Sequence, residues 1–304
     1  MNLKKKGKVH YLSSDKVFDI INLLGMIVLL VIFAWPLWFV VIASISEPNE
    51  VWLGNVVLLW KNFTLVAYEE IIKYEAIWIG YKNTIIYTVL GTLLNVFMTI
   101  CAAYPMSRKD WMPRKIVAYL VLFTMYFSGG LVPTYLVVNN LNLTNTVWAM
   151  IVPGACSVSN ILITRTYFLS SIPDSLKEAA DLDGANALQY LIKVLLPLSK
   201  PIIAVITLYY AVGHWNNYFS ALIYLSDVDL MPLQSFLRDL LMSSKMVMDT
   251  VNSGMDTEEF LRQMQLAQNL KYSAIIVSTI PVLCIYPKIQ KYFVKGIMVG
   301  SVKG

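Results

Sequence analysis

Long stretches without a charged side chain are the feature that most constrains how this chain folds. Residues 116–164 contain no Asp, Glu, Lys or Arg over 49 positions, and three more uncharged stretches cover 20–46, 83–107 and 201–226. A helix needs about 20 apolar residues to cross the hydrocarbon core of a bilayer. Charged residues make up only 14% of the chain, against about 25% in soluble domains. The pattern predicts an all-α integral membrane protein.

Six transmembrane helices are expected, because the longest stretch can hold two and its middle, residues 139–146, is polar and turn-like. The predicted spans cover about 17–45, 80–106, 116–138, 147–168, 201–225 and 268–293. The last span depends on an uncharged run of only 16 residues, 272–287, so its helix must extend into polar flanks. The apolar run after Lys16 is too long for a cleavable signal peptide, and no A-x-A site follows it. It is therefore interpreted as a retained first span.

The distribution of charge predicts the orientation of the spans. If the N-terminus lies inside, the inner segments hold 17 of the 24 basic residues, and the outer segments, about 47–82 and 227–271, hold 12 of the 19 acidic ones. Cytoplasmic loops of membrane proteins carry an excess of Lys and Arg. The net charge of +5 then reflects topology, and no basic–aromatic patch indicates nucleic acid. The expected regions are a cytoplasmic tail 1–16, a transmembrane domain 17–295 with an extracellular loop 227–270, and a cytoplasmic tail 296–304.

Several kinds of catalytic site are not visible in the sequence. Cys101, Cys156 and Cys284 all fall inside predicted spans, where a thiol behaves as a small apolar side chain. The two histidines, His10 and His214, are far apart, so no metal site is expected. No G-x4-G-K-[ST] loop is present, so the chain should not hydrolyse ATP. It is not expected to be an enzyme.

Residues 171–200 form the one long amphipathic, charge-bearing segment between two apolar spans on the predicted inner side. Pro173 suits the first turn of a helix, where its missing N–H would be unpaired anyway. Asp174 and Glu178 lie toward the N-terminal half of that helix, where its dipole favours negative charge. Ala179 and Ala180, which follow, are strong helix formers with small side chains, so another protein surface could approach closely.

A turn and a second short helix are predicted after this first helix. Gly184 fits a left-handed helix stop, and Asn186 with Gln189 fits an N-cap with its capping-box partner. Pro197 and Pro201 then end the second helix and start the fifth span. We therefore expect a helix–turn–helix on the cytoplasmic face.

The spacing within this segment resembles the signature loop of ABC-importer permeases, which docks onto an ATPase subunit. Glu178-Ala179-Ala180, Gly184 and Leu196-Pro197 follow the pattern E-A-A-x3-G-x9-hydrophobic-x-L-P, with Val194 where the pattern prefers isoleucine. The resemblance implies that seven residues of the 171–200 loop couple to the ATPase: Glu178, Ala179, Ala180, Asp183, Gly184, Leu196 and Pro197. The alternative is an amphipathic interfacial hairpin with no partner.

Segments elsewhere extend the resemblance over about residues 15–304. They are Phe39-Val40-Val41-Ile42-Ala43-Ser44, Gly80-Tyr81-Lys82-Asn83-Thr84, Ala103-Tyr104-Pro105-Met106-Ser107-Arg108, Phe127-Ser128-Gly129-Gly130-Leu131-Val132-Pro133-Thr134-Tyr135, Gly213-His214-Trp215-Asn216-Asn217-Tyr218 and Gly296-Ile297-Met298-Val299-Gly300-Ser301-Val302-Lys303-Gly304. Together they are similar to the carbohydrate ABC-transporter permeases of the MalG-like type, and within them to the LplC/YtcP-type subgroup of binding-protein-dependent transport system inner membrane components.

The resemblance implies a type I ABC importer permease fold in the cell membrane of a bacterium. The implied partners are a second, homologous permease subunit, two copies of a cytoplasmic ABC ATPase, and an extracellular sugar-binding protein, often a lipoprotein. An oligosaccharide or complex carbohydrate is the implied substrate, and the lipid bilayer surrounds the chain. ATP and Mg would be bound by the ATPase, with no cofactor in this chain. It also implies that loop 227–270 faces the binding protein and that tail 296–304 contacts the ATPase pair.

Polar and aromatic residues inside the predicted spans are candidates for the sugar path, because polar groups at depth are costly and mark function. The candidates are His214, Trp215, Asn216, Asn217 and Tyr218 in span five, with Tyr126 and Ser128 in span three. The alternative for span five is hydrogen bonding between helices, and the two interpretations stay open. Gly129-Gly130, beside Ser128 in span three, either permit close helix packing or break the helix, and we favour packing.

Two other classes of membrane protein predict sequence features that an importer subunit does not need. A stand-alone secondary transporter predicts inverted repeats and ionisable residues near mid-membrane, and neither is visible. A membrane enzyme predicts a nucleophile–base set, a carboxylate pair or a metal set at depth, and none is visible in the sequence.

Overall fold

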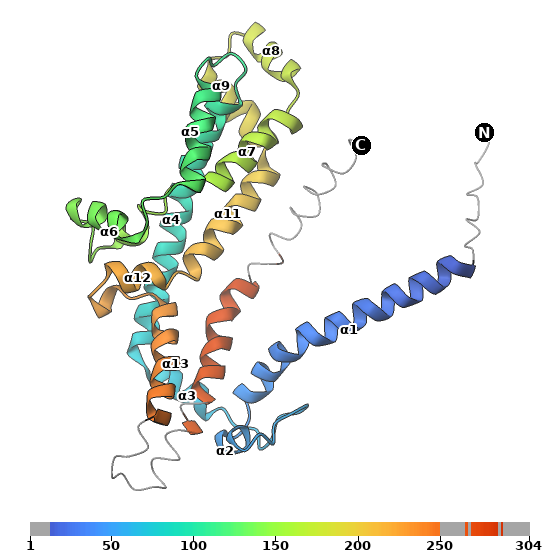
Figure 1. Cartoon of the computed structure of the whole chain (residues 1–304), viewed down its shortest axis with the longest axis vertical. Coiled ribbons are helices and arrows are strands. Elements are labelled where there is room, and N and C mark those ends of the chain that lie inside the picture. Colours follow the sequence, from blue (N-terminus) through green and yellow to red (C-terminus); the bar gives the residue numbers. More distant parts are fainter. Residues whose placement is uncertain (1–12, 250–264, 267–268, 285–286, 288–304) are drawn as a thin grey trace. The chain divides into compact units, whose positions relative to one another are not determined.

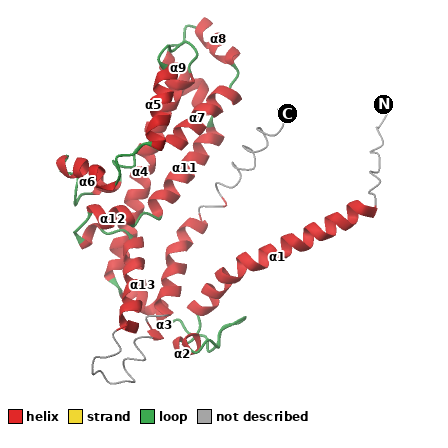
Figure 2. Ribbon diagram, in the orientation of Figure 1, coloured by secondary structure: helices red, strands yellow, loops and turns green. Residues whose placement is uncertain are grey.

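The computed structural model describes residues 13–249, 265–266, 269–284 and 287, and all regular secondary structure in these residues is helical (Figure 1, Figure 2). The chain divides into two compact units. One unit holds residues 1–69 with 252–276, and the other holds residues 70–251 with 277–304.

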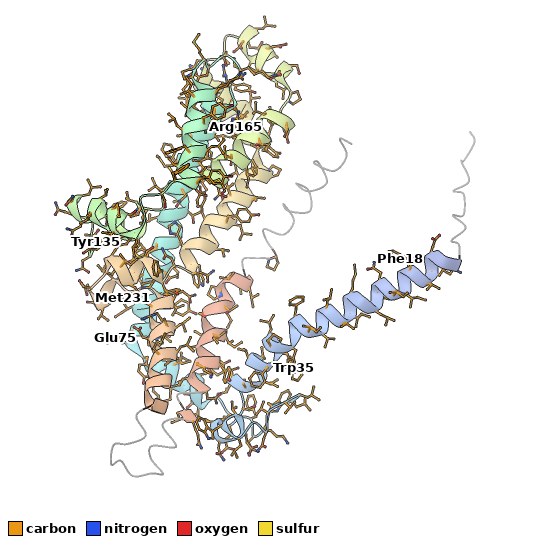
Figure 3. All side chains as sticks on the ribbon, in the orientation of Figure 1. Phe18, Trp35, Glu75, Tyr135, Arg165 and Met231 are labelled. Carbon is orange, nitrogen blue, oxygen red and sulfur yellow. The ribbon has the colours of Figure 1, made fainter. Side chains whose placement is uncertain are left out.

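The first unit is built on a long apolar helix, α1 (Ser13–Ser44), followed by the short α2 (Pro48–Trp52). Side chains such as Phe18 and Trp35 project from α1 and are exposed (Figure 3). Only the end of α1 is packed, where Ile42 and Ala43 are buried in a small apolar cluster. An apolar helix exposed over most of its length is typical of a surface that faces lipid or another membrane helix.

The C-terminal end of α1 is held by hydrogen bonds to the start of the helix Asn269–Cys284. The Asn269 Nδ2 atom donates to the Ser46 carbonyl at 2.8 Å, and the Ser273 hydroxyl donates to the Ser44 carbonyl at 3.3 Å. Carbonyls at a helix end have no partner within the helix, so these side chains satisfy groups that burial would otherwise make costly.

The second unit contains most of the chain. In order, its helices are α3 (Val66–Lys73, which begins in the first unit), α4 (Glu75–Ser107), α5 (Arg114–Tyr126), α6 (Leu131–Asn140), η1 (Val147–Met150), α7 (Val158–Ser171), α8 (Asp174–Leu182), α9 (Ala187–Tyr190), η2 (Leu191–Leu195), α10 (Leu196–Leu198), α11 (Lys200–Trp215), α12 (Phe219–Tyr224), η3 (Val228–Leu230) and α13 (Leu233–Asp249). The long helix α4 is central, with α7, α11 and α13 packed along it (Figure 1).

Among the described residues, two helices are long and apolar enough to cross a membrane alone, α1 and α4. Two bent pairs pass the same test together: α5 with α6, at 113°, and residues 187–198 with α11, at 82°. The described part of predicted span six is the 16-residue helix Asn269–Cys284. Tail 296–304, residues 1–12 of the other tail, and residues 250–264 of loop 227–270 lie outside the described residues.

The predicted span over 116–138 is bent, and of the two interpretations of its glycines the structure favours the helix break over the packing that we preferred. Helix α5 ends at Tyr126 and α6 begins at Leu131. Gly130 has φ +85°, and a Cβ atom added there would meet nothing within 4 Å. Glycine is therefore required here by the backbone angle that breaks the helix and not by a close neighbour.

Spans four and five also differ from single helices. Within 147–168 the α-helix begins only at Val158, capped by the Ser157 side chain, after an irregular segment that contains Pro153 and Gly154. Within 201–225 helix α11 ends at Trp215. The Asn216 amide donates to the Val212 carbonyl at 3.0 Å, so a side chain satisfies a backbone group at the helix end.

Candidate functional site

The segment 171–200 forms the predicted helix–turn–helix. Helix α8 begins at Asp174, one residue after Pro173, which is its N-cap instead of its first helical residue. Glu178 and Ala179 are exposed on α8, whereas Ala180 is buried against the body of the unit. Ala180 is therefore small because it packs inward, and the free surface of α8 is carried by Glu178 and Ala179.

The turn after α8 has the predicted chemistry. Gly184 has φ +75°, the left-handed conformation that favours glycine, and its N–H donates to the Asp181 carbonyl. The predicted capping box is confirmed: Asn186 and Gln189 exchange two hydrogen bonds of 2.9 Å between side chain and backbone. Asp183 and Gly184 are both exposed, so the turn is free on its outer side.

The second helical part runs as one rod from Ala187 to Leu198, and only then does the chain bend into α11. It widens into a π-helical stretch at Leu191–Leu195, just before Pro197. A proline inside a helix lacks an N–H and clashes with the carbonyl four residues earlier. The wider turn makes room for that ring. The rod ends at Leu198, one residue after Pro197, and α11 begins with Pro201 in its first turn, in agreement with the predicted positions of the two prolines. Leu196 is half-buried and Pro197 is exposed.

A hollow of about 430 Å³ lies between α8 and the end of α4. Its lining includes apolar side chains, Phe168, Leu169, Ile172 and Leu195, and the charged side chains of α8. At its rim Arg108 makes a two-pronged ion pair with Asp110, at 2.8 and 2.5 Å. These hydrogen bonds hold the pKa of the Asp110 carboxyl at about 2, below its usual range.

Further contacts join the loop to the helices around it. Lys109 forms an ion pair with Asp174 of α8, and the Tyr104 hydroxyl donates to the Ala187 carbonyl at 2.9 Å. Arg165 of α7 lies toward the end of the second unit that carries α8 (Figure 3) and donates from Nε to the Met106 carbonyl at 3.0 Å. The hairpin is thus attached by Tyr104 of α4 and by Lys109 just after it, and Arg165 joins α7 to the same end of α4.

The structure does not bring the candidates for the sugar path together in one cluster. Trp215 is 7% exposed, and its Nε1 atom donates to the Ser278 carbonyl at 3.1 Å. Asn217 accepts a hydrogen bond from the Ser220 N–H at the start of α12. Tyr218, 43% exposed, and Tyr126, 76% exposed, lie on different helical segments. The buried and capping side chains therefore act within this chain, and the two tyrosines remain free.

His214 belongs to a polar seam along α4 that sequence reasoning missed. Its Nε2 atom is 2.8 Å from the Asn95 Oδ1 atom, and the Asn95 amide in turn donates to the Gly154 carbonyl. Thr99 is 2.6 Å from the Tyr210 hydroxyl. The signal was present in the sequence, since Thr84, Thr88, Thr92, Asn95 and Thr99 recur every three or four residues. That spacing puts them on one face of a helix.

Comparison with known proteins gives the family. Residues 75–299 match the model of the family described as "Binding-protein-dependent transport system inner membrane component". The chain belongs to this family. It is therefore a transport permease subunit located in a membrane, with the all-helical ABC permease fold.

Individual relatives agree with this family. The chain is 38% identical over 293 residues to the polygalacturonan/rhamnogalacturonan transport system permease protein YtcP of Bacillus subtilis (strain 168), covering 95% of this chain and 99% of that protein. It is 35% identical over 299 residues to Protein LplC of the same organism, covering 97% and 98%. The expected similarity to carbohydrate permeases of the LplC/YtcP type is confirmed.

A solved structure is also similar. One chain of a bacterial ABC transporter involved in the import of the acidic polysaccharide alginate matches with a TM-score of 0.81 and 32% sequence identity. The match covers 94% of this chain and all of that one. The likeness therefore extends over nearly the whole architecture.

Proposed function

We propose that this chain is one permease subunit of an ATP-driven, binding-protein-dependent importer of oligosaccharides or complex carbohydrates. The observation that carries the proposal is the α8–α9 hairpin, which leaves Glu178 exposed in a chain that matches a polysaccharide permease over 95% of its length. In this proposal the chain forms half of the translocation path, and a second, homologous permease subunit forms the other half. Two cytoplasmic ATPase subunits bind ATP and Mg, and an extracellular sugar-binding protein or lipoprotein delivers the substrate.

In this proposal the ATPase docks on α8, where Glu178 is exposed and lines the hollow. Glu178 supplies an exposed carboxylate, and Ala179 beside it allows close approach of the partner. Gly184 and Asp183 set the turn, and Leu196-Pro197 shape the rod that leads into α11. A short helix on a rigid turn suits the transmission of a rigid-body movement between subunits.

The proposed topology places this hairpin and both termini in the cytoplasm, in the plasma membrane of a bacterium. Six crossings are then made by α1, α4, the bent pair α5–α6, α7 with the segment before it, α11 with α12, and the helix that begins at Asn269. Helix α13 and the residues after it form the outer loop, which faces the binding protein. The tail 296–304 contacts the ATPase pair.

For the sugar path, the geometry favours a division of roles within span five. Trp215 and His214 contact neighbouring helices of the same chain, which supports the packing interpretation for both. Tyr218 and Tyr126 keep exposed rings, whereas the Asn216 amide is hydrogen-bonded to the Val212 carbonyl of its own helix. An exposed aromatic ring is a suitable face for a sugar contact, so we assign the path to the two tyrosines. A stand-alone secondary transporter would need an ionisable residue at mid-membrane for ion coupling. His214 is hydrogen-bonded to Asn95 of a neighbouring helix, which gives no support to that alternative.

The experiment that tests docking compares Glu178→Ala with Glu75→Ala. Glu75 is an exposed glutamate at the opposite end of the second unit from α8 (Figure 3), so it controls for loss of a surface carboxylate. We expect Glu178→Ala to reduce co-purification of the ATPase and sugar-dependent ATP hydrolysis in proteoliposomes, with the control near wild type. Wild-type coupling in Glu178→Ala would contradict the docking proposal.

A further inference from the structure

The hydroxyl of Tyr104, on the last turn of α4, is hydrogen-bonded both to Arg108, which follows α4, and to the first residue of α9. It donates to the Ala187 carbonyl at 2.9 Å and accepts from the Arg108 Nη1 atom at 2.8 Å. Ala187 is the first residue of α9 and directly follows the turn. The hydroxyl therefore bridges a long membrane helix and the N-terminal end of the second hairpin helix.

Arg108 is itself fixed in this position. Its Nε and Nη2 atoms bind Asp110, and its guanidinium lies over the rings of Tyr104 at 5.6 Å and Tyr190 at 6.0 Å. A guanidinium with a bidentate partner and an aromatic face has few other orientations open to it. Arg108 thus keeps the Tyr104 hydroxyl aimed at α9.

The other attachments of the hairpin hold different parts of it. Tyr190 and Leu195 bury their side chains in an apolar cluster of the second unit that includes Phe168 and Ile206, which fixes the middle of the second helical rod. Under α8 lies the hollow of about 430 Å³, so apart from Ala180 the helix has little apolar support. The ion pair of Lys109 with Asp174, at the N-terminus of α8, is largely exposed. Exposed ion pairs contribute little to stability. Ala185 of the turn is half-buried against the same cluster, and the Lys177 ammonium of α8 lies 5.6 Å from the centre of the Tyr190 ring. Neither contact reaches the first residue of α9, which is joined to α4 by the Tyr104 hydroxyl.

We propose that Tyr104 is a positioning residue that fixes the angle of α8 and the turn relative to α4, and that movement of the hairpin reaches α4 through it. The inference rests on the proposed docking of an ATPase on α8. Without the hydroxyl, the turn between α8 and α9 would absorb part of the displacement that the ATPase imposes. Transport would then become less tightly coupled to ATP hydrolysis, although the subunits still assemble.

The first experiment measures coupling with Tyr104→Phe, which removes the hydroxyl and keeps the ring over Arg108. The matched control is Tyr119→Phe on α5, where the hydroxyl has no hydrogen bond within the described part of the chain and the ring is exposed. In proteoliposomes with the partner permease, the ATPase and the binding protein, we expect the sugar moved per ATP to fall about fivefold in Tyr104→Phe, the size of effect that loss of an ordinary hydrogen bond gives. The control should match wild type.

The second experiment measures the angle directly. Spin labels are placed at Leu182 and Met112, which are 90% and 93% exposed, after the three free cysteines are replaced by serine. Tyr104→Phe keeps the Arg108–Asp110 ion pair, so the segment that carries the label at Met112 is not disturbed. A broader distribution of distances between the two labels in this variant therefore reports movement of the label at Leu182 on α8. Arg108→Lys, which cannot make the bidentate pair, should broaden it as well, and Tyr119→Phe should not.

Several outcomes would overturn the proposal. An unchanged ratio of sugar to ATP in Tyr104→Phe would do so, and so would an unchanged distance distribution. Loss of the ATPase from the Tyr104→Phe complex would show that the hydroxyl supports docking instead of transmission. If the wild-type complex binds no ATPase, the proposed function fails, while the spin-label measurement still decides whether Tyr104 fixes the angle.

Discussion

The imidazole ring of His214 on α11 lies directly against Gly91 on α4, so that a Cβ atom added at Gly91 would overlap the ring. The absence of a side chain at position 91 lets the two helices approach at the level where His214 meets the polar seam. Small residues at such contacts are a common means of helix association in membranes.

Gly91→Ala is therefore expected to destabilise the protein, because overpacking a helix contact costs about 1–3 kcal/mol. The matched control is Gly213→Ala on α11, where an added Cβ atom would meet nothing within 4 Å. Thermal unfolding of the purified protein in detergent should show a lower midpoint for Gly91→Ala and an unchanged or higher one for Gly213→Ala. Equal midpoints for Gly91→Ala and wild type would contradict the close contact.

Trp215→Phe should lower stability and leave the sugar affinity of transport unchanged. The Trp215 Nε1 donor is buried against the Ser278 carbonyl, and loss of one such hydrogen bond costs about 1 kcal/mol. Tyr218→Ala should have the opposite pattern, with normal stability and a raised KM for uptake, because its ring is exposed. A changed KM in Trp215→Phe at normal stability would place Trp215 in the path.

Gly130→Ala should also be destabilising, but for a backbone reason. The residue has φ +85° and ψ −174°, a region open almost only to glycine, and forcing another residue into it costs about 1–3 kcal/mol. Gly129→Ala is the control, since its added Cβ atom would come no closer than 3.4 Å to Pro133. The thermal midpoint of Gly130→Ala should be lower than that of Gly129→Ala. If Gly130→Ala straightens the α5–α6 pair, the distance between spin labels placed on α5 and α6 should change.

Asp110→Asn tests the ion pair at the rim of the hollow through its pH dependence. The folded-state pKa of Asp110 is lowered to about 2, so the pair adds stability above the unfolded-state pKa of about 3.9. That contribution is lost as the pH falls toward 2. We expect the difference in thermal midpoint between wild type and Asp110→Asn to stay constant from pH 8 to about 5 and to shrink below about 4. A difference that grows on acidification would contradict this sign.

The orientation of the chain can be tested by cysteine labelling. In a cysteine-free background, a membrane-impermeant reagent added to intact cells should label Asn55→Cys, which is exposed in the segment after α2, and should not label Asp181→Cys on α8. Permeabilised cells should label both positions. Labelling of position 181 in intact cells would place the hairpin outside and remove the ATPase proposal with it.

Local features could be predicted from the sequence because their causes are local. The stop at Gly184 and the capping box of Asn186 with Gln189 each depend on residues within one turn of helix. The sequence of Gly129-Gly130 is compatible with either packing or a helix break, because it does not determine the backbone angle that decides between them. The burial of Trp215 was not predicted either, since its partner Ser278 lies 63 positions further along the chain.

The polar seam of α4 illustrates the remaining difficulty. The regular spacing of Thr92, Asn95 and Thr99 is visible in the sequence, but the partners of Asn95 and Thr99 on α11, His214 and Tyr210, lie more than a hundred residues away. Only the tertiary structure shows which polar residues of span two and span five are partners. For His214, the hydrogen bond to Asn95 favours the helix contact over the sugar contact, the two interpretations that the sequence leaves open.

The hydrogen bonds of that seam also determine which parts of the molecule can move. Lipid gives no hydrophobic force that would press α4 and α11 together, so the bonds of Asn95 and Thr99 to α11 and the close approach at Gly91 are what join the two helices. We expect helices joined in this way to move together as one rigid body. A change of shape during a transport cycle is then expected where the backbone already turns sharply, at the 82° bend before α11 and the 113° bend after α5.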